Sequence, residues 1–389
     1  MTTAVELRAH DVDRERGFLP ASDPPARLPA EFAAWDELGA ALPKLLMTDE
    51  LRAQIERLPP LDAAALGDPP ALRRAMMILS FLGHGYVWGQ PPVVDSVPAR
   101  LARPWHQVAQ RLGRPPVLSY ASYALDNWRR LDAGRPIELG NIVLLQNFLG
   151  GEDEEWFVLV HVAIEARAGP VLAAAAGAQE AVARDETPAV LEHLGAIATG
   201  LVAMHDILAR MPERCDPYVY FRRVRPYLHG WADHPSLPEG VRYEGVADYA
   251  GRPQRFRGET GAQSSIVPTL DAALGVAHAD DPLRRYLEEM LDYMPPAHRA
   301  FVRAVAEGPA LRDYVRRRAG THPELKDAYN AAIDGVDRFR STHLDYARRY
   351  IINQARSEAR NPNDVGTGGT PFGRYLKKHR DETSRHRLP

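Results

Sequence analysis

The sequence has few of the residues that build several common kinds of site. Its 389 residues include one cysteine, Cys215, which excludes a disulfide framework and any cysteine-based zinc or iron–sulfur centre. The net charge of −3 gives no reason to expect nucleic acid as a partner. No window of roughly 18 residues is both apolar and uncharged, and the charged N-terminus lacks the apolar segment of a signal peptide. We therefore expect a soluble cytoplasmic protein without a transmembrane helix.

Several catalytic motifs are also missing. The chain has no His-Glu-x-x-His zinc helix, no P-loop, no G-x-G-x-x-G after a strand and no G-x-S-x-G elbow. The glycine-rich run 366–370 lacks the lysine and the strand–loop–helix context of a phosphate site. The fourteen histidines form no 2-His-1-carboxylate pattern at short spacing. Non-haem iron held by residues distant in sequence stays open.

Helical periodicity dominates what is present, and clear strand alternation is scarce, so the sequence predicts an all-α fold. A composition shift at GGEDEE, residues 150–155, marks a boundary between a small N-terminal domain (1–150) and a large catalytic domain (151–389). Within the large domain, a glycine-rich loop at about 353–370 is expected to be mobile, and the polar tail after it to fray.

Individual helices follow from apolar spacing and from proline and glycine breakers. They are expected at 34–46, 51–58, 72–82, from 98 to 112, from 118 to 130, at 156–168, and after the proline start signals at 187–188 and 281–282. Pro43 should break the first of them. The run 83–92, GHGYVWGQPP, should end the third as a loop.

The helix predicted at 327–351 carries the most informative side chains. Its apolar stripe has a period of three to four residues, and Arg340 and His343 lie within it, one turn apart. His343 has two interpretations at this point: a core histidine bonded to a backbone carbonyl, or an axial haem ligand that faces an apolar slot. Arg340 would then suit a haem propionate or an ordering acid.

Several further stretches, taken together and in order, resemble the indoleamine 2,3-dioxygenase family of haem enzymes. They are GFLP (17–20), LSYASYALDNW (118–128), RPYLHGW (225–231), VRYEGV (241–246), GETGAQSS (258–265), YMPPAHR (293–299), RSTHLDY (340–346) and GTGGT (366–370). The resemblance covers roughly residues 15–378. It implies a large helical domain that binds haem b, capped by a smaller, mostly helical N-terminal domain. The activity it implies is opening of the pyrrole ring of L-tryptophan with both atoms of O2, which gives N-formylkynurenine.

The resemblance also implies roles for individual residues. His343 falls on the proximal iron ligand, and Arg340 on an arginine that pairs with an acid near the haem, here Asp271. Arg225 falls on the arginine that binds the substrate carboxylate; the proline after it should bias its backbone away from the helical region. Three loop residues complete this set: Thr260 and Gly261 edge the haem, although GETGAQSS departs from the usual GGSAGQSS, and Thr367 closes over the substrate.

The pocket for the indole shows the clearest departures from the family pattern. Tyr120 and Phe157 match pocket aromatics, whereas Tyr220 stands where the family has phenylalanine and Tyr123 where it has a smaller residue. His161 occupies a position that is serine in the mammalian enzymes. Histidine there is similar to the distal residue of tryptophan 2,3-dioxygenases, which bonds the indole N–H, so His161 is the candidate catalytic residue.

The expected partners are L-tryptophan or a related indole, O2 and an electron donor that keeps the iron ferrous, with no nucleic acid or membrane, and a monomer is favoured. Two alternatives differ in class. One is a related haem enzyme that oxygenates another indole, which the altered Tyr123, Tyr220 and His161 allow. The other is a non-catalytic haem-binding protein, against which the retained Arg225 and Thr367 argue.

Overall fold

The structure is a computed structural model and describes residues 5–278, 282–355 and 372–389. Helices make up 63% of it and strands 3%, which confirms the all-α class. The α-helices are α1 (Ala33–Leu45), α2 (Leu51–Arg57), α3 (Pro69–Trp88), α4 (Ala99–Leu112), α5 (Glu152–Ala183), α6 (Thr187–Ala209), α7 (Pro217–Val219), α8 (Arg225–Leu228), α9 (Ile266–Leu274), α10 (Pro282–Met290), α11 (Pro296–Ala306), α12 (Leu311–Arg318), α13 (Pro323–Ala347), α14 (Asn353–Ala355) and α15 (Phe372–Ser384).

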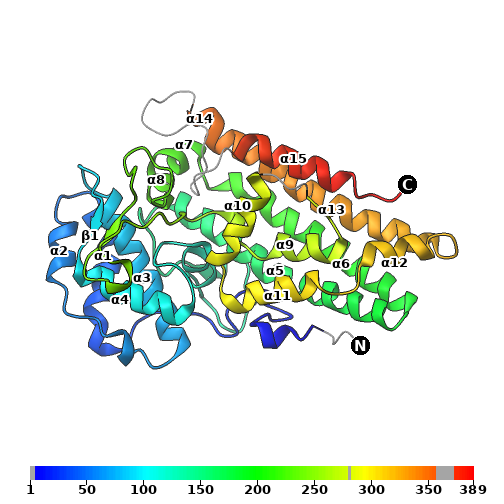
Figure 1. Ribbon diagram of the computed structural model, residues 1–389, viewed down its shortest axis with the longest axis horizontal. Helices are drawn as coiled ribbons and strands as arrows, with labels where there is room; N and C mark the ends of the chain where they lie inside the picture. Colours follow the sequence, from blue (N-terminus) through cyan, green and yellow to red (C-terminus); the bar gives the residue numbers. More distant parts are fainter. Residues whose placement is uncertain (1–4, 279–281, 356–371) are drawn as a thin grey trace.

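The helices form two groups (Figure 1). Helices α1–α4 gather at one end of the molecule, and the long helices α5, α6 and α13 run through the other, with α15 along α13. Two short strands, β1 (Ser96–Val97) and β4 (Arg242–Tyr243), pair in parallel and tie the N-terminal helices to the segment after α8. A second pair, β2 (Arg129–Arg130) and β3 (Ile142–Val143), is antiparallel. The boundary near residue 150 stays a prediction, and it falls just before α5 begins.

Helix α6 packs against both α5 and α13 and therefore sets how these two helices are placed. Its buried stripe repeats every three to four residues, as the sequence predicts, through Val190, Leu194, Ile197, Leu201, Met204 and Leu208. Glycines allow the close approach. A Cβ on Gly200 would lie 2.2 Å from Cγ2 of Val171 in α5, and one on Gly335 of α13 would lie 2.9 Å from Cβ of Leu201. The absence of a side chain at these two positions is what lets the three helices pack tightly.

Several predicted boundaries are wrong for reasons of packing. Helix α3 continues through Gly83 and Gly85 to Trp88, since each glycine faces bulky side chains: a Cβ on Gly83 would lie 2.1 Å from Trp105. Pro43, expected to break the first helix, lies inside α1 near its C-terminal end. The helix expected at 118–130 is a single wide turn, Ala121–Leu125, followed by β2. Glycine and proline thus act here as contact residues within helices.

The C-terminal residues are also more ordered than predicted. Most of the tail forms α15, and Leu388 beyond it is buried. The side chain of Asn330 in α13 donates to the Leu388 carbonyl oxygen at 3.0 Å and accepts from its N–H at 2.8 Å. The tail is therefore docked on α13 through its backbone.

By length and hydropathy alone, the helical stretches Glu152–Ala183 and Thr187–Glu213 are apolar enough to cross a membrane, contrary to the expectation from the sequence. In the first, 72% of the apolar window is buried inside the fold, as in the core helix of a soluble protein. The second buries only 28% of its window, along the stripe that faces α5 and α13. This signal is weak evidence for a membrane, and the absence of a membrane partner stays a prediction.

Candidate functional site

His343 lies on α13. The residue is exposed to solvent, and yet desolvation by the surrounding protein lowers its pKa to about 4, with smaller contributions from His161 and Arg340. Among the described residues, neither ring nitrogen of His343 has a hydrogen-bond partner. A core histidine is usually buried and paired, and His343 is neither among the described residues, but the choice between a core residue and an iron ligand stays a prediction. The ring is neutral at pH 7 and offers a nitrogen lone pair.

His161 on α5 lies near His343. Its effect on the pKa of His343 places the two imidazoles within electrostatic range of each other. Nδ1 of His161 lies 2.7 Å from the Phe157 carbonyl oxygen. A carbonyl only accepts, so Nδ1 carries the hydrogen and Nε2 keeps its lone pair. Desolvation lowers the pKa of His161 and keeps the ring neutral, so Nε2 can accept a hydrogen bond from a bound N–H group.

Aromatic rings form a continuous wall beside His161. The ring centroid of Phe157 lies 4.7 Å from that of His161, 4.6 Å from Tyr220 and 6.4 Å from Tyr123. Tyr120 meets His161 edge-on at 5.9 Å. Phe157 and His161 are only half-buried, although the residues around them on α5 are buried. This wall brings together all the predicted indole-binding residues, and a flat aromatic molecule can stack or pack edge-on against it.

Arg225 is fully buried at the start of α8, and Nη1 donates to Nε2 of His229 at 3.2 Å. Burial lowers the pKa of Arg225 to about 10, so the guanidinium stays charged at neutral pH. Its Cζ lies 5.5 Å from the centre of the Phe221 ring. A buried guanidinium fork suits a carboxylate bidentately. The predicted departure from helical backbone is wrong: Arg225 has φ −53° and ψ −36° despite the proline that follows.

Wide π-helical turns supply the backbone around these side chains. They are Ala121–Leu125, Tyr220–Val224 and Arg348–Ile352. Tyr123 lies in the first, Tyr220 opens the second immediately before Arg225, and Tyr350 lies in the third, 5.9 Å from the ring of Tyr220. Such turns are rare and concentrate at functional sites. A π turn uses an i→i+5 hydrogen-bond pattern, which explains how the chain stays helical up to the proline after Arg225.

The loop 258–265 closes one side of the wall. Gln263 accepts from the N–H of Tyr120 at 2.9 Å and donates to the Gly258 carbonyl oxygen at 2.9 Å. Thr260 caps the short turn Gly261–Gln263 through the N–H of Ala262. Thr260 is half-buried and Gly261 exposed, and whether they touch a cofactor stays a prediction.

Two buried acids near the wall were missed by the sequence reasoning. Glu165, one turn beyond His161 on α5, accepts from the Tyr120 hydroxyl at 2.9 Å and the Ser264 hydroxyl at 2.7 Å. Desolvation raises its pKa to about 7. Desolvation also raises the pKa of Glu259 to about 8, and the charge of Glu259 adds to the raised pKa of Tyr120 and of Tyr220. The sequence signal for Glu165 is an acid within an apolar helix, and the signal for Glu259 is the departure of GETGAQSS from the family pattern.

The remaining predicted residues lie as follows. Nη2 of Arg340 lies 2.5 Å from Oδ2 of Asp271, so the predicted pair is present, one turn from His343. Thr367 and most of the predicted mobile loop lie outside the described residues. A surface cleft of about 410 Å³, lined by residues 93–96 and 236–240, contains none of the site residues.

Comparisons with known proteins identify the family of the chain. The family of indoleamine 2,3-dioxygenases matches residues 6–386. The chain is 34% identical to indoleamine 2,3-dioxygenase 1 of Rattus norvegicus and 32% identical to indoleamine 2,3-dioxygenase 2 of Homo sapiens, each over 97% of this chain and 95% of the relative. It is 33% identical to indoleamine 2,3-dioxygenase of Saccharomyces cerevisiae, over 97% of this chain and 92% of the relative. The chain belongs to the indoleamine 2,3-dioxygenase family.

Membership in the indoleamine 2,3-dioxygenase family makes the chain a haem-dependent dioxygenase that acts on indoles. Its own residues fit such a group. His343 offers a neutral imidazole that has no hydrogen-bond partner among the described residues, and His161 on α5 lies within electrostatic range of it with a lone pair of its own. The surrounding protein desolvates both rings. An axial ligand, an apolar slot and a distal polar group are the features by which a protein holds and tunes haem.

Proposed function

We propose that this indoleamine 2,3-dioxygenase binds haem b through His343 and converts L-tryptophan to N-formylkynurenine with O2. The observation that supports the proposal most is the facing pair of neutral histidines, with a fully buried arginine beside the aromatic wall. When bound, the haem iron would supply the activation of O2. An electron donor would keep the iron ferrous. The protein residues then bind and orient the substrate and exclude water.

Each group has a distinct task toward the substrate. The indole lies against Phe157, with Tyr120 and Tyr220 as further walls. Arg225 pairs with the α-carboxylate, a strong interaction in a site without bulk water. His161 accepts the indole N–H at Nε2, because its Nδ1 hydrogen is already committed to the Phe157 carbonyl. This hydrogen bond fixes the rotation of the indole and so turns the C2–C3 bond toward the haem.

The first test is spectroscopic. Full-length protein supplied with haem should show a Soret band and, with ascorbate, a mediator, O2 and L-tryptophan, should form N-formylkynurenine. With ¹⁸O2, both oxygen atoms should appear in the product. His343→Ala should lose the Soret band, whereas His322→Ala, a change at a partly exposed histidine just before α13, should keep it. Full haem retention in His343→Ala would remove the assigned ligand.

The second test concerns the carboxylate. Arg225→Lys keeps the charge but loses the planar fork. It should raise KM for L-tryptophan about 30-fold, the equivalent of about 2 kcal/mol for a disrupted buried charge pair. The KM for tryptamine, which has no carboxylate, should change little. Arg223→Ala, on the exposed side of the same turn, is the matched control and should leave both values unchanged. Equal losses for both substrates would contradict the assignment.

A second candidate is oxygenation of another indole. The hydroxyls of Tyr123 and Tyr220 and the carboxyl of Glu259 add polar groups near the wall. A ring substituent that hydrogen-bonds could therefore be preferred. Product mass decides: incorporation of a single ¹⁸O atom, or turnover of a substituted indole without turnover of L-tryptophan, would favour this candidate.

A further inference from the structure

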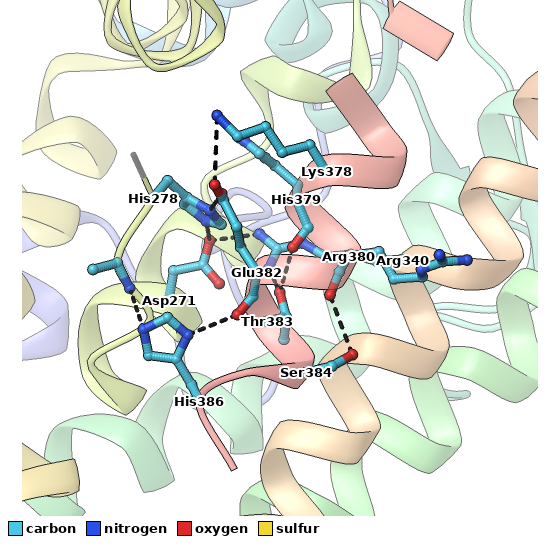
Figure 2. A network of polar contacts seen from close by, with 11 residues as sticks. Asp271, His278, Arg340, Lys378, His379, Arg380, Glu382, Thr383, Ser384 and His386 are labelled. Atoms are coloured by element: carbon cyan, nitrogen blue, oxygen red, sulfur yellow. Dashed lines mark hydrogen bonds and ion pairs between the residues drawn. The ribbon is translucent and has the colours of Figure 1, made fainter. Parts of the chain in front are cut away.

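A second group of metal-ligand side chains lies beside the Arg340–Asp271 pair, where α15 meets the end of α9 (Figure 2). His379 and Glu382 are one turn apart on α15 and share a face. His278 follows α9 and points to the same place. One donor atom from each residue lies within 4.8 Å of the other two. Two imidazoles and a carboxylate make the donor set of many three-residue zinc sites.

The contacts of His278 are those of an oriented metal ligand. Nε2 lies 3.1 Å from Oδ2 of Asp271, and Nδ1 lies 2.7 Å from Oε2 of Glu382. Because both carboxylates only accept, Nε2 donates to Asp271 and Nδ1 donates to Glu382 in this arrangement, and Nδ1 is the nitrogen that would lose its hydrogen to bind a metal beside Glu382. A histidine that binds metal through one nitrogen usually donates the other N–H to a carboxylate, which fixes the ring. Asp271 is itself held by Arg340 at 2.5 Å.

His379 completes the donor set. Its ring stacks on that of His278, with centroids 4.0 Å apart and an angle of 15° between the planes. An imidazole nitrogen of His379 is among the three donor atoms that lie within 4.8 Å of one another. Glu382 and His379 are buried and His278 is half-buried, so bulk water competes weakly for a bound ion.

The charges at the cluster are compatible with a divalent ion. Asp271 and Glu382 supply two carboxylates, and Arg340 neutralises one of them. Lys378 lies 3.5 Å from Glu382, but it is 38% exposed and on a flexible stem, so its ammonium can turn toward solvent. A metal would replace the proton between His278 and Glu382, which adds a single net positive charge.

We propose that His278, His379 and Glu382 bind a divalent transition metal of the zinc type, distinct from the haem iron, with Asp271 orienting His278. Tetrahedral zinc with ligands at about 2.0 Å holds neighbouring donor atoms about 3.3 Å apart, so binding draws the three side chains together by rotamer changes. The ion joins α15 to the end of α9 and stiffens the support of Arg340. The proposal is independent of the substrate and of haem occupancy.

The competing arrangement is a metal-free ion network in which a protonated His278 bridges two carboxylates. Titration of zinc sulfate into tag-free, chelator-treated full-length protein separates the two. Calorimetry should give one tight site per chain, and elemental analysis after dialysis should give one zinc in addition to any haem iron. Glu382→Gln, which keeps the side-chain shape, and His379→Ala should each weaken this site at least about tenfold, as for a lost ligand or orienting partner.

Controls make the result decisive. His322→Ala removes a partly exposed histidine outside the cluster and should bind zinc like the unmodified protein. Zinc should also raise the melting temperature of the unmodified protein but not that of Glu382→Gln, since only a native-state ligand stabilises the fold. Absence of a tight site, or equal binding by Glu382→Gln and the unmodified protein, overturns the proposal and leaves the ion network. Both outcomes of the zinc titration are interpretable whether or not tryptophan is a substrate.

Discussion

At the scale of single residues, the buried carboxyl of Glu165 links the stability of the fold to the candidate site. It is completely buried, and one carboxyl oxygen accepts from Tyr120 and Ser264 while the other has no hydrogen-bond partner among the described residues. An unpaired buried carboxylate oxygen destabilises the charged form. The carboxyl is therefore poised to titrate near neutrality, one turn from His161.

This placement predicts a pH dependence of stability. The folded pKa of Glu165 is raised to about 7 from 4.5, so between these values the folded protein holds a proton that the unfolded chain has lost. The contribution of this proton to the free energy of unfolding is complete below the pKa of Glu165 in the unfolded chain. It is lost as the pH rises through the pKa of Glu165 in the folded protein. The free energy of unfolding should fall by on the order of 3 kcal/mol across this window on account of Glu165 alone.

Glu165→Gln keeps the acceptor oxygen and cannot titrate. Its stability relative to the unmodified protein should therefore increase between about pH 5 and about pH 8. Urea midpoints at both pH values measure the effect. Glu152→Gln, at the exposed start of the same helix, should leave the pH dependence unchanged. A parallel pH profile for Glu165→Gln and the unmodified protein would show that Glu165 stays ionised.

The sequence could reveal a site residue only where the residue type and its spacing along the chain indicated its chemistry. His343 and Arg340 could be found because polar side chains within an apolar stripe are unusual, and Arg225 because the family pattern falls on it. Glu259 acts on tyrosines from other elements, and no local spacing predicts those contacts. The sequence could not show that Nδ1 of His161 bonds its own helix, since that depends on a rotamer.

At the scale of elements, helix existence could be predicted more reliably than helix ends. The apolar stripe of α6 and its start at Thr187 follow from periodicity and proline position. The ends fail where glycine serves packing. Gly83 reads locally as a breaker, but burial against Trp105 more than offsets its poor helix propensity. The π turns were missed because the sequence carries no strong signal for an i→i+5 pattern.

A matched pair of substitutions on α6 tests the packing argument. Gly200→Ala places a methyl group 2.2 Å from Val171 and should destabilise the protein by about 1–3 kcal/mol. Gly195→Ala, five residues earlier and exposed, meets no atom within 4 Å and should stabilise it by up to about 1 kcal/mol. Melting temperatures of the two variants should move in opposite directions. A gain in both would mean that α5 and α6 are packed less tightly than described.

At the scale of the whole molecule, the docking of the C-terminal segment joins distant parts of the chain. Helix α15 lies along α13, and residues from both meet the end of α9 around Arg340 (Figure 2). The polar composition of this segment suggested fraying, because its stabilising contacts are hydrogen bonds to α13 and not an apolar stripe. A sequence pattern indicates an apolar stripe but does not indicate hydrogen bonds between distant segments.

Asn330→Ala tests this docking. It leaves the buried N–H and carbonyl of Leu388 without their partners and should cost about 1–3 kcal/mol. Hydrogen exchange at residues 385–388 should accelerate accordingly. Asp334→Ala, one turn along the same helix, removes only an exposed ion pair with Arg387 and should cost less than about 1 kcal/mol. Equal protection in both variants would show that the segment is held by other contacts.

The glycine contacts of α6 have a consequence for engineering. α6 lies against both helices that carry the facing histidines, so the gap between His161 and His343 is set by how closely α6 approaches each of them. That approach depends on Gly200 and Gly335, neither of which belongs to the aromatic wall. A laboratory evolution campaign for bulkier indoles should therefore randomise these glycines together with Val171 and Leu201, and should recover altered substrate range from positions that no bound molecule touches.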